Sequence, residues 1–139
     1  MTADVEATKA EEPLENALKR MVVRNVGSIV VVDDNAPVGI VTERDVSRCV
    51  ARGTDVLKGQ VKTMMSSPLI TVAPTDSVQD AMTLMLKHGV RRLPVVTDAR
   101  LVGIVSERDL LRWVLRVSYE PHIPTEIKQI VENPIHSKN

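Results

Sequence analysis

The sequence contains almost no aromatic residues and only one cysteine. Phe is absent, and Trp and Tyr occur once each among 139 residues. The base-stacking surfaces of single-strand nucleic-acid binders are therefore nearly excluded, and the core must be aliphatic. The single Cys49 excludes an internal disulfide framework and a cysteine-based zinc site, and it fits a reducing compartment.

Net charge and long apolar runs are lacking as well. Eighteen basic residues balance eighteen acidic ones, so the chain offers no overall charge to nucleic acid or to an anionic membrane. No run approaches the roughly 18 to 20 apolar residues of a membrane helix, and the acidic, Ala-rich residues 1–12 do not resemble a signal peptide. We therefore expect a cytoplasmic protein that has neither membrane nor nucleic acid as a partner.

What the sequence does contain is an internal repeat with an offset of 64 residues. Gly39–Asp45 matches Gly103–Asp109 with Thr for Ser as the sole difference, and 16 of 41 aligned positions are identical between 14–54 and 78–118. Such a match indicates a tandem duplication. We predict a first repeat with its linker over 5–60, a second repeat over 61–118 and a tail over 119–139.

Apolar periodicity and turn residues predict the same order of elements in both repeats: strand, helix, hairpin, helix. In the second repeat the predicted strands are Leu69–Val72, Leu93–Val96 and Leu101–Val105, with helices over about 75–88 and 106–117. Either Thr75 or Ser77 can cap the first of these helices.

The first repeat is predicted to have helices over 14–23 and 42–52 and a hairpin of strands 29–32 and 38–41. Its leading segment Val5–Ala10 is a poor strand that lacks a proline stop. Residues 53–65 are polar and contain Gly, so they are predicted to be a linker. In the tail, Thr125–Glu132 is predicted as a short helix that could dock on the body or on a partner.

The duplicated Thr42-x-x-Asp45 and Ser106-x-x-Asp109 have two interpretations. The hydroxyl and the free amides at a helix start can bind a phosphate or ribose oxygen, and the Asp can accept from two sugar hydroxyls. The same spacing is that of a capping box, which would serve only the helix. Duplication of both polar residues around Glu-Arg favours binding.

Arg91 and Arg92 precede the predicted strand Leu93–Val96. The segment 87–116 has seven basic and three acidic residues, a local excess of positive charge. An Arg pair suits bidentate phosphate recognition, although a solvated rim is the simpler interpretation. The first repeat has Gly27 and Ser28 at these positions.

Catalytic chemistry has little support. The three histidines have no Cys, Asp or Glu at metal-ligand spacing, so no metal site is expected. Paired carboxylates, a serine triad and a phosphate-binding P-loop are absent from the sequence, and Cys49 has no evident activating base. We expect a protein that is not an enzyme and needs no catalytic cofactor.

These residues resemble a known family. The duplicated Gly39–Asp45 and Gly103–Asp109, the run Met65–Pro74, and Arg91–Val96 resemble in order and spacing a tandem pair of cystathionine-β-synthase (CBS) domains, called a Bateman module. The resemblance covers about residues 5–118. It implies an α+β fold of two β-α-β-β-α repeats that pack through their sheets with pseudo-twofold symmetry.

The resemblance also implies that clefts between the repeats bind AMP, ADP, ATP or S-adenosylmethionine. Asp45 and Asp109 would hold ribose hydroxyls, and Thr42 and Ser106 would touch ribose or phosphate. The backbone of Ile70–Val72 would read the adenine edge. The candidate ligand-binding residues are Ile70, Thr71, Val72, Arg91, Arg92, Leu93, Pro94, Ser106, Arg108 and Asp109 in the second repeat, and Gly27, Ser28, Ile29, Thr42 and Asp45 in the first.

Because the first repeat lacks the strand-proline unit and the Arg pair, we expect a better site in the second repeat. The final helix is more apolar than one buried stripe requires, which favours a homodimer through residues that include Leu110, Trp113 and Val114. The predicted function is a non-catalytic sensor that signals ligand binding to a regulated protein. The alternative is a structural dimerisation module with vestigial clefts.

Overall fold

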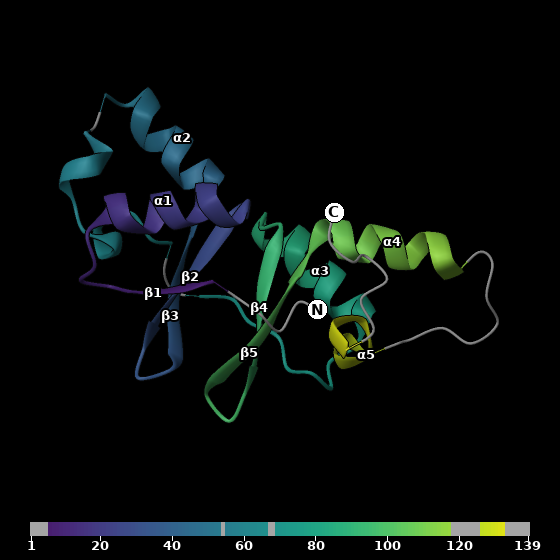
Figure 1. Cartoon of the computed structure of the whole chain (residues 1–139). Helices are drawn as coiled ribbons and strands as arrows, with labels where there is room; N and C mark the ends of the chain where they lie inside the picture. The colour runs from purple at the N-terminus through teal and green to yellow at the C-terminus, as the bar shows by residue number, and fades with distance from the viewer. Residues whose placement is uncertain (1–5, 54, 67–68, 118–125, 133–139) are drawn as a thin grey trace. The chain divides into compact units, whose positions relative to one another are not determined.

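The computed structural model describes residues 6–53, 55–66, 69–117 and 126–132. The chain divides into two compact units, one over Val5–Leu69 and the other mainly over Ile70–Asn139. Each unit contains one repeat (Figure 1). The α+β fold class and the two tandem repeats are thereby confirmed.

The first unit is a three-stranded sheet with two helices. Strand β2 lies in the middle, parallel to β1 and antiparallel to β3. In chain order the elements are β1 (Ala7–Lys9), α1 (Leu14–Arg24), β2 (Ser28–Asp33), β3 (Ala36–Thr42), α2 (Glu43–Ala51) and two short 3-10 turns, η1 (Val56–Lys58) and η2 (Val61–Thr63).

The second unit is built on the hairpin of β4 and β5, with three helices. In place of a leading strand, only Val72 forms a parallel bridge, to Val95. The predicted strand Leu69–Val72 is thus reduced to one residue. The elements are α3 (Val78–His88), β4 (Arg92–Thr97), β5 (Arg100–Ser106), α4 (Glu107–Val117) and α5 (Ile127–Glu132).

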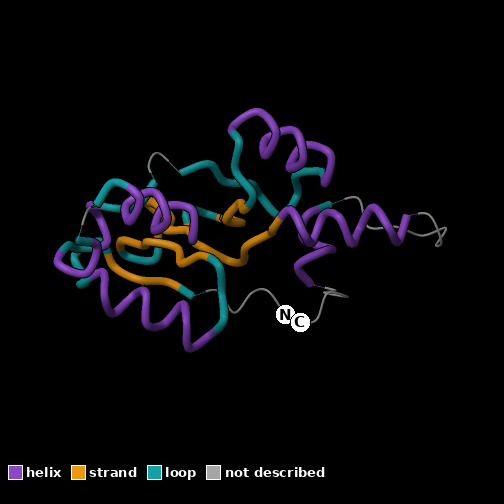
Figure 2. Tube along the Cα trace, turned by 90° about the horizontal axis from the view of Figure 1, so that it is seen from above, coloured by secondary structure: helices purple, strands orange, loops and turns teal. Residues whose placement is uncertain are grey.

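The two hairpins, whose strands are orange in Figure 2, share irregular as well as regular features. Each has a register shift in its first strand, between Val31 and Val32 and between Val95 and Val96. Each turns over two residues with positive φ, which are Asp34–Asn35 and Asp98–Ala99. Such turns match the right-handed twist of the strands. The duplication therefore extends to bulge and turn geometry.

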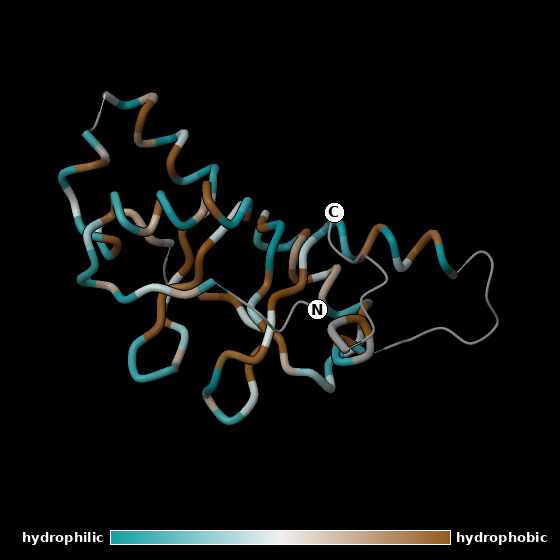
Figure 3. The backbone as a smooth tube through the Cα atoms, viewed as in Figure 1, coloured by the Kyte–Doolittle hydropathy of each residue, from teal (hydrophilic) through white to brown (hydrophobic). Residues whose placement is uncertain are grey.

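Each unit has its own aliphatic core. In the first, Leu14, Ala17 and Met21 form one face of α1, and they pack with Ile29, Val31 and Val41 of the hairpin. Equivalent positions of α3, β4 and β5 form the second core. The strands that supply these residues are mostly brown in Figure 3, while the turn of the first hairpin is teal. Apolar residues recur every three to four positions in the helices and every second position in the strands, and the sequence prediction rested on this periodicity.

The leading segment of the first repeat, predicted to be a poor strand, does form β1. Ala7–Lys9 pairs in parallel with Val30–Val32, and the Val30 amide donates to the Glu6 carbonyl at 3.0 Å. Side chains hold it as well, because the buried Thr8 hydroxyl donates to Glu12. Polar partners therefore compensate for the low strand propensity of the segment.

The predicted linker over 53–65 is wrong for its second half, which completes the first core. Val61 and Met64 are buried with Leu14 and Met21. The Val61 amide donates to the Glu12 carbonyl, and the Lys62 amide donates to that of Ala10, at 3.0 and 2.9 Å. We call residues 60–64 the first return segment, since the chain comes back here to the start of its own repeat.

The tail helix α5 is the counterpart of that segment in the second repeat. Ile127 and Ile130 are buried in the second core, as Val61 and Met64 are in the first. The Ile127 amide donates to the Asp76 carbonyl and the Lys128 amide to that of Pro74. Residues 126–130 are therefore a second return segment, and the question of where the tail helix docks is answered: it docks on its own repeat. The predicted cap Thr125 lies outside the described residues.

Among the described residues, no helix has the length and apolar character needed to cross a bilayer.

Candidate functional site

The predicted site residues of the second repeat gather at the open end of the β4–β5 hairpin. Arg92 and Ser106 are direct cross-strand partners there. The Glu107 amide donates to the Arg91 carbonyl at 2.8 Å, which fixes the start of α4 beside the start of β4. An Arg pair, a hydroxyl and, one turn along α4, the carboxylate of Asp109 are thus brought to one edge of one unit.

Ser106 and Asp109 form a capping box. The Asp109 amide donates to the Ser106 hydroxyl at 3.1 Å, and the Ser106 amide donates to Asp109 Oδ2 at 2.8 Å. The structural interpretation of this spacing is therefore correct. It also corrects the expectation of free amides at the helix start, because the amides of Glu107 and Asp109 are already bonded within the unit. Asp109 is only 8% exposed.

Residues Ile70–Val72 run toward the same edge. The Val72 amide donates to the Pro94 carbonyl at 3.0 Å, and the Val96 amide donates to the Val72 carbonyl at 2.9 Å. Parallel pairing in this register places Thr71 and Ile70 alongside the beginning of β4. Val72 itself is buried in the core, whereas the Thr71 side chain is exposed.

Leu93 and Pro94, two of the candidate ligand-binding residues, are both fully buried. Leu93 lies in the hydrophobic core with Val95, so its side chain faces the helices. Because successive side chains of a strand alternate, Pro94 and Arg92 belong to the opposite face. Arg91 and Arg108 are exposed, and Arg92 is half-buried.

The first repeat builds the same edge with fewer charges. Ser28 pairs with Thr42, and the Glu43 amide donates to the Gly27 carbonyl at 3.1 Å. Ser28 is buried, and Ile29 belongs to the core. The positions of Arg91 and Arg92 are therefore taken in the first repeat by Gly27, which has no side chain, and by the buried Ser28.

Asp45 has a partner that the sequence did not predict. Its Oδ2 accepts from the Thr42 amide and hydroxyl at 2.8 and 3.0 Å, which completes a capping box. Its Oδ1 accepts from the Ser66 hydroxyl at 3.0 Å. Ser66 stands in the run Met65–Pro74, which the sequence assigns to the second repeat. A single serine that contacts a distant carboxylate carries no pattern by which it could have been found.

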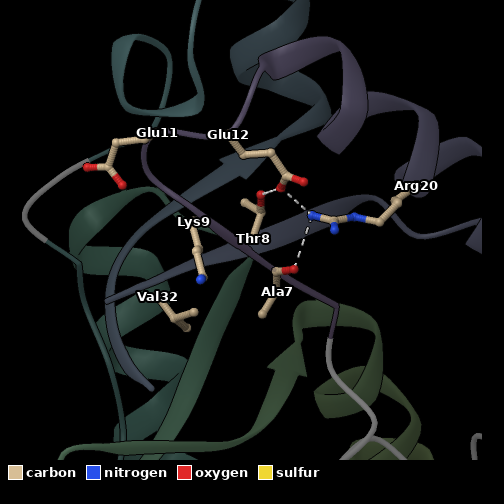
Figure 4. Close-up of a pocket in the computed structure, with 7 residues that line it drawn as sticks. All are labelled: Ala7, Thr8, Lys9, Glu11, Glu12, Arg20 and Val32. Carbon is tan, nitrogen blue, oxygen red and sulfur yellow. Dashed lines mark hydrogen bonds and ion pairs between the residues drawn. The ribbon is translucent and has the colours of Figure 1, made fainter. Parts of the chain in front are cut away.

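A separate cavity of about 580 Å³ lies in the first repeat, and no predicted site residue lines it (Figure 4). Arg20 dominates it: its Nη2 contacts Glu12 at 2.8 Å and the Ala7 carbonyl at 3.2 Å. Lys9 and Glu11 complete a lining of mixed charge. This arrangement joins α1 to β1, which explains why β1 is ordered.

Only some of the α4 residues predicted to form a dimer contact are exposed. Leu110 is buried in the second core and is only 3% exposed, which leaves little of it for a partner. Trp113 is partly buried and packs against the same core. Exposed instead are Leu111 at 58% and Leu115 at 59%, together with Val114. Leu111 and Val114 also line a groove of about 220 Å³ with Leu86 of α3.

Comparison with known proteins agrees with the duplication. The family model described as "CBS domain" matches residues 1–52 and 61–116. The CBS domain-containing protein YhcV of Bacillus subtilis is 39% identical over 113 residues, which cover 79% of each chain. The chain spans between 34% and 79% of its curated relatives' lengths, and less than two thirds of several of them.

Solved structures show the same fold with adenosine compounds bound. The CBS domain protein PAE2072 from Pyrobaculum aerophilum, complexed with AMP, is 30% identical with a TM-score of 0.73, and the match covers 84% of this chain and 92% of that one. The CBS domain pair of protein MJ0100, in complex with 5-methylthioadenosine and S-adenosyl-L-methionine, is 26% identical with a TM-score of 0.72. That match covers 80% of this chain and 92% of the other.

Proposed function

Because the chain belongs to the CBS-domain family, we propose that it is a non-catalytic regulatory module whose second repeat binds an adenosine compound. AMP, ADP, ATP and S-adenosylmethionine are the candidate ligands. AMP comes first, because a relative of 30% identity and the same fold was solved with AMP.

One observation carries this proposal: Arg92, Ser106 and Asp109 meet at one edge of the second repeat. A guanidinium can hold a phosphate through two parallel hydrogen bonds, and an aspartate can accept from ribose hydroxyls. Arg91 adds a second guanidinium beside the first. Thr71 is exposed beside this edge, and its polar groups suit an adenine edge. The required chemical groups are therefore present within a single unit.

Regulation follows if the ligand prefers one arrangement of the two repeats over another. A ligand can shift such an equilibrium only by its difference in affinity for the two states. A cytoplasmic partner that distinguishes these states would then respond to the ligand concentration.

Calorimetric titration with AMP tests the proposal. Arg92→Ala should weaken AMP binding by about tenfold or more, since a charge-assisted hydrogen bond is lost. Arg100→Ala is the matched control, because Arg100 is an exposed arginine of the same hairpin at its turn end. Equal affinities for the wild-type chain and Arg92→Ala would contradict the assigned edge.

The ranking of the two repeats is tested by their aspartates. We expect Asp109→Asn to reduce AMP affinity more than Asp45→Asn does. The amide keeps a polar side chain at each helix cap, so loss of binding is not confused with loss of the helix. If Asp45→Asn abolished binding while Asp109→Asn left it unchanged, the ranking would be reversed.

A dimerisation module is the second candidate function, and exposed apolar side chains on the helices favour it. Leu86 is 84% exposed, and Val22 of α1, which aligns with it in the repeat, is 79% exposed. Isolated exposed residues are ordinary, but Leu86 of α3 lines one groove with Leu111 and Val114 of α4, and such a surface suits an interface with a second copy. We expect a dimer at tens of micromolar by light scattering, and a monomer for Leu111→Glu. A dimer that binds no adenosine compound at millimolar concentration would favour this function over the first.

A further inference from the structure

The carboxylate of Asp45 in the first repeat is already engaged by the chain itself. We infer that Ser66 acts as a clasp on Asp45, which holds this carboxylate away from a nucleoside ligand and must be released before the first repeat can bind one. The inference rests on the proposed function, because it concerns the same class of ligand.

The acceptor capacity of Asp45 is nearly filled. An ionised carboxylate offers about four acceptor positions. Three are taken by donors of the chain itself: the Thr42 amide, the Thr42 hydroxyl and the Ser66 hydroxyl. A ribose diol brings two donors, so at least one of the three present contacts must break. Asp45 is also only 9% exposed.

Ser66 is the contact that a ligand displaces at the lowest cost. The Thr42 amide contact belongs to the capping box of α2, and its loss would leave an amide at the helix start unsatisfied. The Thr42 hydroxyl is held in the same cap, because it also accepts from the Asp45 amide at 3.3 Å. Ser66 is exposed, so its hydroxyl can exchange Asp45 for water. Release of Ser66 therefore frees one carboxylate oxygen without damage to the helix.

Backbone contacts hold Ser66 in place independently of its hydroxyl. Ser66 and Ile40 form an antiparallel bridge, with amide-to-carbonyl distances of 2.8 and 3.3 Å. The segment approaches β3 so closely that a Cβ at Gly39 would lie 2.7 Å from Met65 Sδ and 3.1 Å from the Ser66 carbonyl oxygen. A side chain at position 39 would push the segment outward. Gly39 is therefore part of the clasp.

AMP titration of Ser66→Ala tests the clasp. The variant removes the competing donor and keeps the backbone bridge to Ile40. We expect the first repeat to gain affinity by about tenfold, seen as a tighter weak site or as a second AMP per chain. Ser47→Ala, an exposed serine of α2 in the same unit, is the control and should titrate like the wild-type chain.

Gly39→Ala is a second variant, because its methyl group requires the Met65 side chain to move and the Ser66 carbonyl to shift by a few tenths of an ångström, which disturbs the position of Ser66. Thermal unfolding of each variant establishes that it is folded. If the wild-type chain binds AMP while Ser66→Ala and Gly39→Ala show the same affinity and stoichiometry as wild type, the clasp is refuted and the proposed function stands. If no variant and no wild-type chain binds AMP, both the proposed function and the clasp are refuted.

Discussion

The two repeats have equivalent backbones but different polar side chains. Both have a bulge after the third apolar residue of the first hairpin strand, a two-residue turn with positive φ, a capping box and a return segment. They differ where the sheet ends. At the open end of the hairpin the second repeat places Arg91 and Arg92, whereas the first has Gly27 and a buried Ser28.

The start of each repeat differs in the same way. In the first, Arg20 and Glu12 form an ion pair at 2.8 Å, and Arg24 contacts Glu6 at 2.9 Å. In the second, Asp76 holds the position of Glu12 and accepts from the Ala73 amide at 2.8 Å, which makes a local turn. Both copies therefore share one backbone geometry, while the charged residues support the leading strand in the first and lie at the open end of the hairpin in the second.

If the two repeats are equivalent, substitutions in the return segments should cause the largest losses of stability. Ile127→Ala removes a fully buried side chain from the second core, and we expect it to lower the free energy of unfolding by about 2–5 kcal/mol. Val61→Ala should act in the same direction with a smaller loss, since fewer atoms are removed. Urea unfolding measures both, and Leu86→Ala, an exposed site, is the control. A loss for Ile127→Ala no greater than that of the control would show that α5 is not part of the core.

Arg20→Leu places the residue of the second repeat, Leu84, into the first. We expect a loss of about 1–3 kcal/mol, because the carboxylates of Glu6 and Glu12, 16% and 25% exposed, lose a charged partner. Amide exchange of residues 7–9 should accelerate. Lys19→Ala removes an exposed ion pair with Glu15 and should cost no more than about 0.5 kcal/mol. Equal effects of the two variants would mean that Arg20 does not support β1.

The capping boxes should be worth the same in both repeats. Thr42→Ala and Ser106→Ala each remove the hydroxyl that accepts from the amide of the third helical residue. We expect each to cost about 1 kcal/mol in chemical unfolding. A much larger loss for one variant would show that its hydroxyl has a structural role beyond the cap.

The smallest effect concerns the turns. Ala99 adopts φ of 64°, a conformation that disfavours any residue with a Cβ. Ala99→Gly should therefore raise the free energy of unfolding by about 0.5–1 kcal/mol. Asn35→Gly, at the equivalent position, should gain less because Asn tolerates positive φ. The order of the two midpoints in thermal unfolding checks this.

Local patterns predicted the helices and hairpins, because their apolar residues recur with the period of the element. Helix α1 was expected to end at Val23 and ends at Arg24, and strand β4 is one residue longer than predicted at each end. The return segments escaped prediction for a physical reason. Each contributes two apolar side chains one turn apart within a polar stretch, which is too short for a periodic signal.

The site could be predicted as a set of residues but not as a set of contacts. Sequence spacing identified Ser106 and Asp109, while the bonds that already occupy them depend on how α4 begins. The clasp depends on tertiary structure alone. Likewise, the apolar excess of α4 was visible, but which of its residues enter the core was not. Leu110 does, and Leu111 does not.

The return segments also determine when each repeat can fold. In both copies the residues that close the core are synthesised last, after the hairpin and the second helix of that repeat. A nascent first repeat cannot bury Leu14 and Met21 fully until Met64 has left the ribosome, while the second repeat is being made. Its long-range contacts also slow closure relative to a local hairpin. The first return segment nevertheless emerges long before the second, so the order of translation lets the first repeat close before the second is complete.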